Sequence, residues 1–185
     1  MSDLDIVNNP LLDSQERLSA LRDISAPSKG EINNHIHTVY SFSPYTPAMA
    51  AFKAREAGLE AAGSVDHDSI AAAEEMIAAC AILGIGGCCG FELRVSFKKG
   101  PNGKAFAGRK INNPDSEGLV YMTVQGIPAP AIKKTEEFLN PIRAKRLERS
   151  KKMTAEANIL LKDAGLPPID FDADVIHKSC YLRGG

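Results

Sequence analysis

Short apolar runs alternate with amphipathic segments from residue 31 onward, and this alternation predicts an α/β fold. We expect strands over residues 32–37, 59–65 and 85–95, because each is a short run bounded by turn-forming residues. Helices are expected over residues 47–57 and between the second and third strands. This strand–helix–strand order indicates parallel strands joined by right-handed crossovers.

Capping residues predict where these helices begin and end. Thr46 precedes Pro47, an order typical of an N-cap followed by proline at the first helical position. Gly58 is expected to end that helix. Asp68 or Ser69 is expected to cap the second helix.

The first 30 residues are predicted to form an N-terminal extension. They are polar and mixed in charge, and residues 13–22 are expected to form a short helix with Leu18 and Leu21 on one face. Turn-forming residues then separate this extension from residues 31–97, which we interpret as the main α/β unit.

Residues 98–185 are predicted to hold a further strand, a helical insertion and a tail. The strand is expected over residues 119–124. A long helix is expected over residues 142–164, because the pair Asn140-Pro141 predicts a break before it.

Composition narrows the class of protein. The chain has 185 residues, of which 44% are hydrophobic, and this is enough for one core. The formal net charge of −1 provides no overall field for nucleic acid or an anionic membrane. No signal peptide or membrane-spanning run is recognisable, so we expect a cytoplasmic protein without a membrane partner.

The cysteines lack CxxC spacing, and we expect buried free thiols: Cys80, Cys88, Cys89 and Cys180.

Side chains of the kind that bind metals follow or end three predicted strands. His35 and His37 are two residues apart, a spacing that puts both rings on one face of a strand. Asp66-His67 ends the second strand, and Glu92 lies near the end of the third. The carboxyl ends of parallel strands meet at one edge, where sites commonly lie. The sequence therefore predicts a metal site at this edge.

The order of these motifs resembles the opening of the PHP (polymerase and histidinol phosphatase) family. The resemblance covers roughly residues 31–95. Its motifs are His35 to Thr38, Asp66 to Ser69, and Gly90 to Leu93. It implies a metal-dependent phosphoesterase built on a distorted (β/α)7 barrel.

The resemblance also implies roles for single residues. His35 and His37 would bind a first ion, and Glu92 would bridge the first and second ions. His67 would bind a third ion, with Asp66 as a ligand or as the partner that orients His67. The family uses two or three divalent ions, commonly zinc, manganese or iron.

The chain departs from the family pattern at several places. Residues 41–44 occupy the loop that in the family offers an acid or histidine to the third ion. Residues 120–127 resemble a family strand with a metal-binding histidine, but this chain has Tyr121 and Gln125 there. The family's closing histidine motifs are missing, and His177 is expected to be structural or exposed. We therefore expect an incomplete barrel, either the front part of a longer protein or a truncated product, with self-association to cover its edges.

Cationic residues indicate how a phosphorylated substrate would be held. Arg94 follows Glu92 by two residues on the same face, so it is expected to meet a phosphate or to form a salt bridge. Arg143, Arg146 and Arg149 resemble the helical insertion of nucleotide-hydrolysing family members, although a solvent-exposed stripe has the same spacing.

The sequence thus favours a hydrolase of small phosphate monoesters or nucleotides, with catalysis by Asp66 and Glu92 and the bound ions. Two alternatives remain open. One is a metal-binding scaffold or regulatory module without turnover. The other is an amidohydrolase-like enzyme, since those enzymes also carry an H-x-H pair on a barrel strand.

Overall fold

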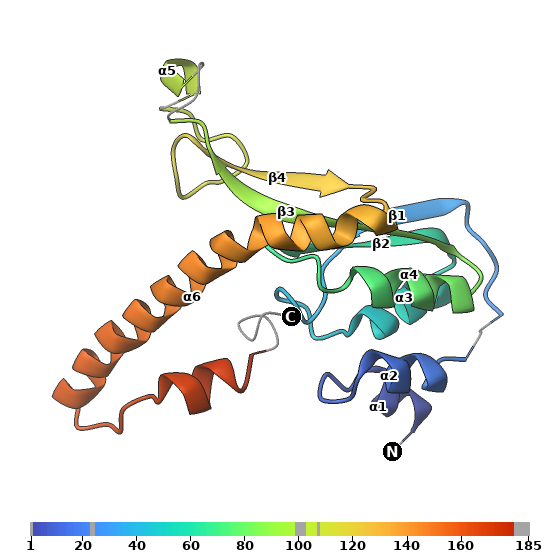
Figure 1. The fold of residues 1–185 in the computed structure, drawn as a ribbon, viewed down its shortest axis with the longest axis horizontal. Coiled ribbons are helices and arrows are strands. Elements are labelled where there is room, and N and C mark those ends of the chain that lie inside the picture. The colour runs from blue at the N-terminus through green and yellow to red at the C-terminus, as the bar shows by residue number, and fades with distance from the viewer. Residues whose placement is uncertain (1, 23–24, 99–102, 107, 180–185) are drawn as a thin grey trace.

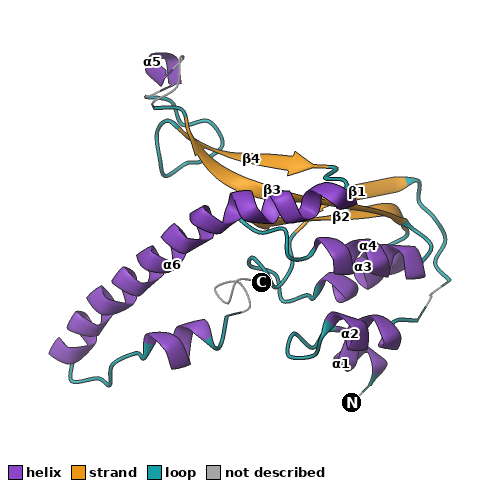
Figure 2. Ribbon diagram, viewed as in Figure 1, coloured by secondary structure: helices purple, strands orange, loops and turns teal. Residues whose placement is uncertain are grey.

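The computed structural model describes residues 2–22, 25–98, 103–106 and 108–179. It is a mixed α/β structure in which a curled four-stranded sheet lies over α3 and α4, with α1 and α2 beyond them (Figure 1). The long helix α6 starts beside the sheet and extends away from it (Figure 2). Cys180 lies outside the described residues, as does part of the glycine- and lysine-rich segment near residue 100.

The sheet contains four strands in the order β1-β2-β3-β4. These are β1 (Glu31–Ile36), β2 (Leu59–His67), β3 (Gly86–Ser96) and β4 (Leu119–Gln125). The predicted parallel pairing is confirmed for β1 with β2 and for β2 with β3. β4 pairs with β3 in the antiparallel sense, which the sequence did not indicate. The curvature is that of a half-barrel, consistent with part of a TIM-like barrel.

The first helix on the sheet, α3 (Pro47–Glu56), begins and ends as predicted. The Thr46 hydroxyl accepts a hydrogen bond from the Met49 N–H at 3.2 Å. Gly58 follows the helix with φ of 86°, a conformation that only glycine adopts readily.

The second helix, α4 (Ala73–Ile82), starts later than predicted. Its N-cap residue is Ala72, so the predicted cap at Asp68 or Ser69 is wrong. Asp68 instead has a left-handed backbone with φ of 55°. The Ser69 hydroxyl accepts from the Ala71 N–H at 3.2 Å, which forms a turn before the helix.

The N-terminal residues pack against the rest of the molecule as two short helices. These are α1 (Asp3–Val7), which was not predicted, and α2 (Ser14–Ala20), which lies within the predicted segment. Val7, Ala20 and Leu21 are buried in one apolar cluster with residues of α3 and α4. The segment is therefore part of the core.

The long helix α6 (Ile132–Asp163) follows a short 3-10 turn, η1 (Ala129–Ala131), and includes Pro141. The predicted break at Asn140-Pro141 is therefore wrong. Proline removes one helical N–H donor, but Leu139 is fully buried on one side of it and Ile142 packs into the same cluster on the other. These contacts hold the helix in place across the proline.

The remaining elements are short. α5 (Gly103–Phe106) lies between β3 and β4, and the π-helix η2 (Phe171–Ile176) follows α6. The Asp170 side chain caps η2 by accepting from the Ala173 N–H at 2.7 Å. Within the described residues, no helix is both long and apolar enough to cross a membrane.

The cysteines agree with the prediction as far as the structure describes them. Cys80 and Cys89 are buried free thiols, and Cys88 is half-buried. Burial raises the pKa of the Cys80 thiol to about 11.

Candidate metal centre

The two histidines of the H-x-H pair converge at the end of β1. Their ring centroids are 5.2 Å apart. Potential ligand atoms of His35, His37 and Glu92 all lie within 4.8 Å of one another. The structure thus brings together two imidazoles and one carboxylate from separate segments, the combination of ligands that a divalent transition metal uses.

Glu92 lies between two histidines. Its Oε2 is 3.2 Å from His35 Nε2, and its Oε1 is 3.2 Å from His67 Nδ1. His67 is placed there because it pairs directly with Glu92 across β2 and β3, so both side chains project to the same face. The Glu92 side chain is only 11% exposed, so each of its oxygens faces a different imidazole inside a sheltered site.

Asp66 points away from this cluster. Neighbouring residues on a strand face opposite sides, and Asp66 is the neighbour of His67 on β2. Its carboxylate accepts from the Thr38 N–H and the Thr38 hydroxyl, both at 2.7 Å. The structure therefore brings Asp66 to the loop that follows His37 instead of to the ring of His67.

The environment favours neutral imidazoles. Burial, together with the neighbouring histidines His67 and His35, lowers the pKa of His37. Burial, together with Arg146, also lowers the pKa of His67. His37 Nδ1 is 2.9 Å from the Ser41 hydroxyl oxygen, which leaves Nε2 to act as a ligand. A neutral ring held by a hydrogen bond at its other nitrogen is the usual state of a metal-binding histidine.

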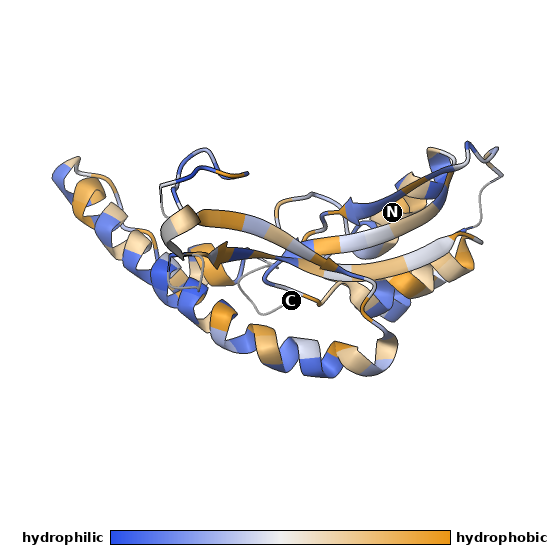
Figure 3. Cartoon of the chain, turned by 90° about the horizontal axis from the view of Figure 1, so that it is seen from above, coloured by the Kyte–Doolittle hydropathy of each residue, from blue (hydrophilic) through white to orange (hydrophobic). Residues whose placement is uncertain are grey.

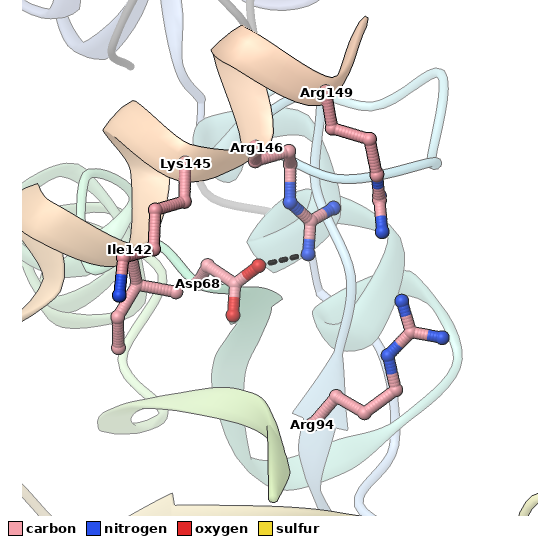
Figure 4. Close-up of a pocket in the computed structure, with 6 residues that line it drawn as sticks. All are labelled: Asp68, Arg94, Ile142, Lys145, Arg146 and Arg149. Carbon is pink, nitrogen blue, oxygen red and sulfur yellow. Dashed lines mark hydrogen bonds and ion pairs between the residues drawn. The ribbon is translucent and has the colours of Figure 1, made fainter. Parts of the chain in front are cut away.

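A cationic pocket of about 280 Å³ lies between β3 and α6, and it reaches Asp68, the residue that follows His67. Its lining residues are Asp68, Arg94, Ile142, Lys145, Arg146 and Arg149. Figure 4 shows the guanidinium groups of Arg94, Arg146 and Arg149 turned toward one another. Arg146 forms an ion pair with the Asp68 carboxylate. Burial lowers the pKa of Arg146 to about 10, so this guanidinium stays charged at neutral pH.

Three of the four arginines predicted to hold substrate line this pocket, namely Arg94, Arg146 and Arg149. Arg143 does not, because it donates to Asn140 Oδ1 at 2.5 Å and lies 3.6 Å from Glu136 Oε1. Lys145 also lines the pocket and was not predicted. The pocket residues of α6 follow a 142, 145, 146, 149 pattern, which is the spacing of one helical face. This spacing of one helical face could have predicted the pocket residues from the sequence, whereas the recurrence of arginine at every third position could not.

An exposed aromatic side chain covers the histidines. Phe42 is 71% exposed, and its ring centroid lies 4.3 Å from that of His37 and 5.4 Å from that of His67. Tyr121 lies on β4 with its ring 5.6 Å from His67. Phe42 thus lies in the loop that follows His37, against the rings of both histidines. His177 is exposed and distant in sequence from this cluster, as predicted.

No protein-family model matches the sequence, and no curated protein matches it. Two solved structures are similar in fold. One is a predicted metal-dependent phosphoesterase from Bifidobacterium adolescentis, with 23% identity, a TM-score of 0.52, and coverage of 71% of this chain and 40% of that chain. The other is an amidohydrolase from Chromobacterium violaceum with bound sulfate and no metal. It has 27% identity, a TM-score of 0.54, and coverage of 73% of this chain and 39% of that chain.

These similarities concern the fold. The aligned part of this chain corresponds to about two fifths of each of the two longer proteins. The two similarities agree with the half-barrel seen here.

Proposed function

We propose that this chain forms the metal-binding part of a hydrolase of phosphate esters. The observation that supports this most is the adjacency of two features: the His35, His37 and Glu92 cluster, and the cationic pocket that reaches Asp68 beside His67. The first suits a divalent ion and the second suits the oxygens of a phosphoryl group. Membership of the PHP family remains a prediction that this adjacency supports.

Different residues of the chain would bind the metal ions and position the loop beside them. The three clustered ligands and His67 would hold one or two divalent ions, with Glu92 between them. Zinc, manganese and iron are the candidates, because all accept imidazole and carboxylate ligands. Bound there, such an ion supplies a Lewis acid and lowers the pKa of water toward neutrality. Asp66 would act by fixing Thr38, and through it the loop after His37.

The cationic pocket favours an anionic substrate. Within the described part of the chain, neither Arg94 nor Arg149 is within ion-pair distance of a carboxylate, although both face the same space (Figure 4). Like charges that face one another are unfavourable, and an anion between them relieves the repulsion. The volume of about 280 Å³ suits a small phosphorylated group. A small phosphomonoester or a nucleotide is therefore the proposed substrate.

The alternative is an amidohydrolase-like activity, which the name of the Chromobacterium violaceum protein favours. That protein holds sulfate, which shares the tetrahedral shape of phosphate. The cluster of cations beside the cluster of ligands favours phosphate esters over amides, because an uncharged amide gains little from three guanidinium groups.

The test is hydrolysis by the purified chain after loading with Mn²⁺ or Zn²⁺. Nitrophenyl phosphate, a nucleoside monophosphate and an N-acyl amino acid would be assayed in parallel, with His37→Ala as the control. Phosphate release that needs both metal and His37 supports the proposal. Hydrolysis of only the amide would select the alternative, and tight metal binding without turnover would indicate a scaffold.

A further inference from the structure

The edge strand β4 is held at Tyr121 by a side chain from the loop before it. The Asn112 side-chain amide accepts from the Tyr121 N–H at 2.9 Å and donates to the Tyr121 carbonyl oxygen at 2.8 Å. The outer side of an edge strand has no neighbouring strand to meet such groups. An amide side chain can meet both, because it carries a donor and an acceptor. Asn112 therefore fixes the backbone of one residue on a mostly exposed strand.

The pairing of β3 with β4 determines which side chain lies next to Tyr121. Tyr121 is directly opposite Arg94. In the same register the Phe97 N–H donates to the Gly118 carbonyl oxygen at 2.9 Å. Hydrogen-bonded and non-hydrogen-bonded pairs alternate along antiparallel strands, so Arg94 and Tyr121 form a non-hydrogen-bonded pair. Side chains are closest in pairs of that kind, and these two project side by side to the face that carries Glu92.

The Tyr121 side chain thus borders both the histidines and the cationic pocket. Its ring centroid is 5.6 Å from that of His67, which lies against Glu92. Its neighbour Arg94 lines the pocket and points toward the arginines of α6 (Figure 4). Among the residues that the structure describes, none hydrogen-bonds to the hydroxyl of this half-buried tyrosine. A phenol hydroxyl in such a place can donate to an oxygen of a bound anion.

We propose that Tyr121 is a substrate-binding residue and that Asn112 is the residue that positions it. A phosphoryl group that contacts both a metal ion at Glu92 and the guanidinium of Arg94 lies next to the Tyr121 ring, because that ring neighbours both. The Tyr121 hydroxyl donates to an oxygen of this phosphoryl group, and the two hydrogen bonds from Asn112 keep the ring level with Arg94. The inference rests on the proposed function, since it takes the substrate to be a phosphate ester.

The test removes the hydroxyl and keeps the ring. Tyr121→Phe preserves the ring contact with His67, so a role in packing alone would leave binding unchanged. Tyr45→Phe makes the same change at an exposed tyrosine of the loop before α3 and is the matched control. Calorimetry measures the Kd of the Zn²⁺-loaded chain for inorganic phosphate, and KM and kcat are measured with nitrophenyl phosphate. Competition with a chromophoric chelator measures Zn²⁺ affinity.

Tyr121→Phe is expected to weaken phosphate binding by about 10-fold, the loss of one hydrogen bond to a charged group. KM should rise by a similar factor, because the same contact is lost from the bound ester. Zn²⁺ affinity should stay constant, since the ligands of the metal cluster are untouched. Tyr45→Phe should leave all of these values unchanged.

Asn112→Ala tests the positioning role through the backbone. The Tyr121 amide proton loses its acceptor, so it should exchange faster in the metal-free chain, as NMR would show. Phosphate binding should weaken by about 3-fold, less than in Tyr121→Phe, because the hydroxyl is displaced and not removed. Asn112→Asp keeps an acceptor for the Tyr121 N–H, and it should recover slow exchange and part of the phosphate affinity.

The role of Tyr121 is overturned if Tyr121→Phe binds phosphate as tightly as the unaltered chain, or if it loses Zn²⁺ affinity to the same extent as phosphate affinity. Unchanged amide exchange or unchanged phosphate affinity in Asn112→Ala overturns the positioning role. If the unaltered Zn²⁺-loaded chain neither binds phosphate nor hydrolyses the ester, the proposed function fails together with this inference. An unaltered chain that does both, with a Tyr121→Phe variant that does both equally well, overturns only the inference.

Discussion

The metal cluster and the cationic helix are built in different ways. The residues next to the ligands are buried: Thr38 and its partner Asp66 are both less than 2% exposed. By contrast, α6 buries only Leu139 along its 32 residues, and Figure 3 shows hydrophilic residues over much of that helix. The comparison suggests that the core fixes the ligands. The cations that would contact substrate lie, apart from Arg94 of β3, on a helix that buries little of its surface.

The largest effect is expected from removing one ligand of the cluster. His37→Ala should weaken Zn²⁺ or Mn²⁺ binding by about 100-fold or more, because one imidazole of a small ligand set is lost. Titration with a competing chelator measures this. His177→Ala removes an exposed histidine elsewhere and should bind metal normally. Equal weakening in both variants would contradict a localised centre.

A second large effect is expected in the sheet that carries Glu92. A Cβ added at Gly90 would overlap the Val124 carbonyl oxygen, so the β3–β4 pairing would have to shift. Gly90→Ala should lower the free energy of unfolding by about 1–3 kcal/mol, as overpacking does. Gly108→Ala is the control, since no atom lies within 4 Å of a Cβ added there. Urea denaturation of both variants would show whether only Gly90→Ala loses stability.

Substitutions in the cationic pocket should change substrate binding and leave metal binding unchanged. Arg94→Gln and Arg149→Gln should each raise KM for a phosphate ester by about 10-fold, the loss of one charge-assisted contact. Zn²⁺ affinity should stay constant. Lys151→Gln, at an exposed position of the same helix, should leave KM unchanged. An unchanged KM in both arginine variants would show that the pocket takes no part in binding substrate.

The smallest effect concerns the cysteines of the buried core. Burial raises the pKa of Cys80 to about 11, so almost no thiolate forms at pH 8, and the thiolate is the reactive species. In the folded chain Cys88 should react with iodoacetamide well before Cys80, as mass spectrometry of digested peptides would show. The difference should disappear in denaturant. Equal rates in the folded chain would mean that Cys80 is accessible.

Local patterns in the sequence were sufficient to predict the parallel strands and the edge of the sheet where the candidate metal ligands lie. Thr46-Pro47 and Gly58 set the ends of α3, because caps depend on a few neighbouring residues. The two-residue spacing of His35 and His37 placed both rings on one side, since alternation along a strand is a local property.

Features that depend on distant residues could not be predicted in the same way. Which face Asp66 occupies depends on the pairing of β2 with β3. The continuity of α6 across Pro141 depends on burial of Leu139 against α4 and β3. The contact between Arg17 and Glu75 joins residues 58 positions apart, and no local pattern indicates that α2 docks there.

The most direct test of the metal centre is anomalous X-ray diffraction from crystals grown with Mn²⁺ or Zn²⁺. We expect a peak about 2.0–2.3 Å from His35 Nε2, from a ring nitrogen of His37 and from a carboxylate oxygen of Glu92. Saturated crystals with no peak between these three side chains, or with the ion bound elsewhere, would contradict the proposed centre.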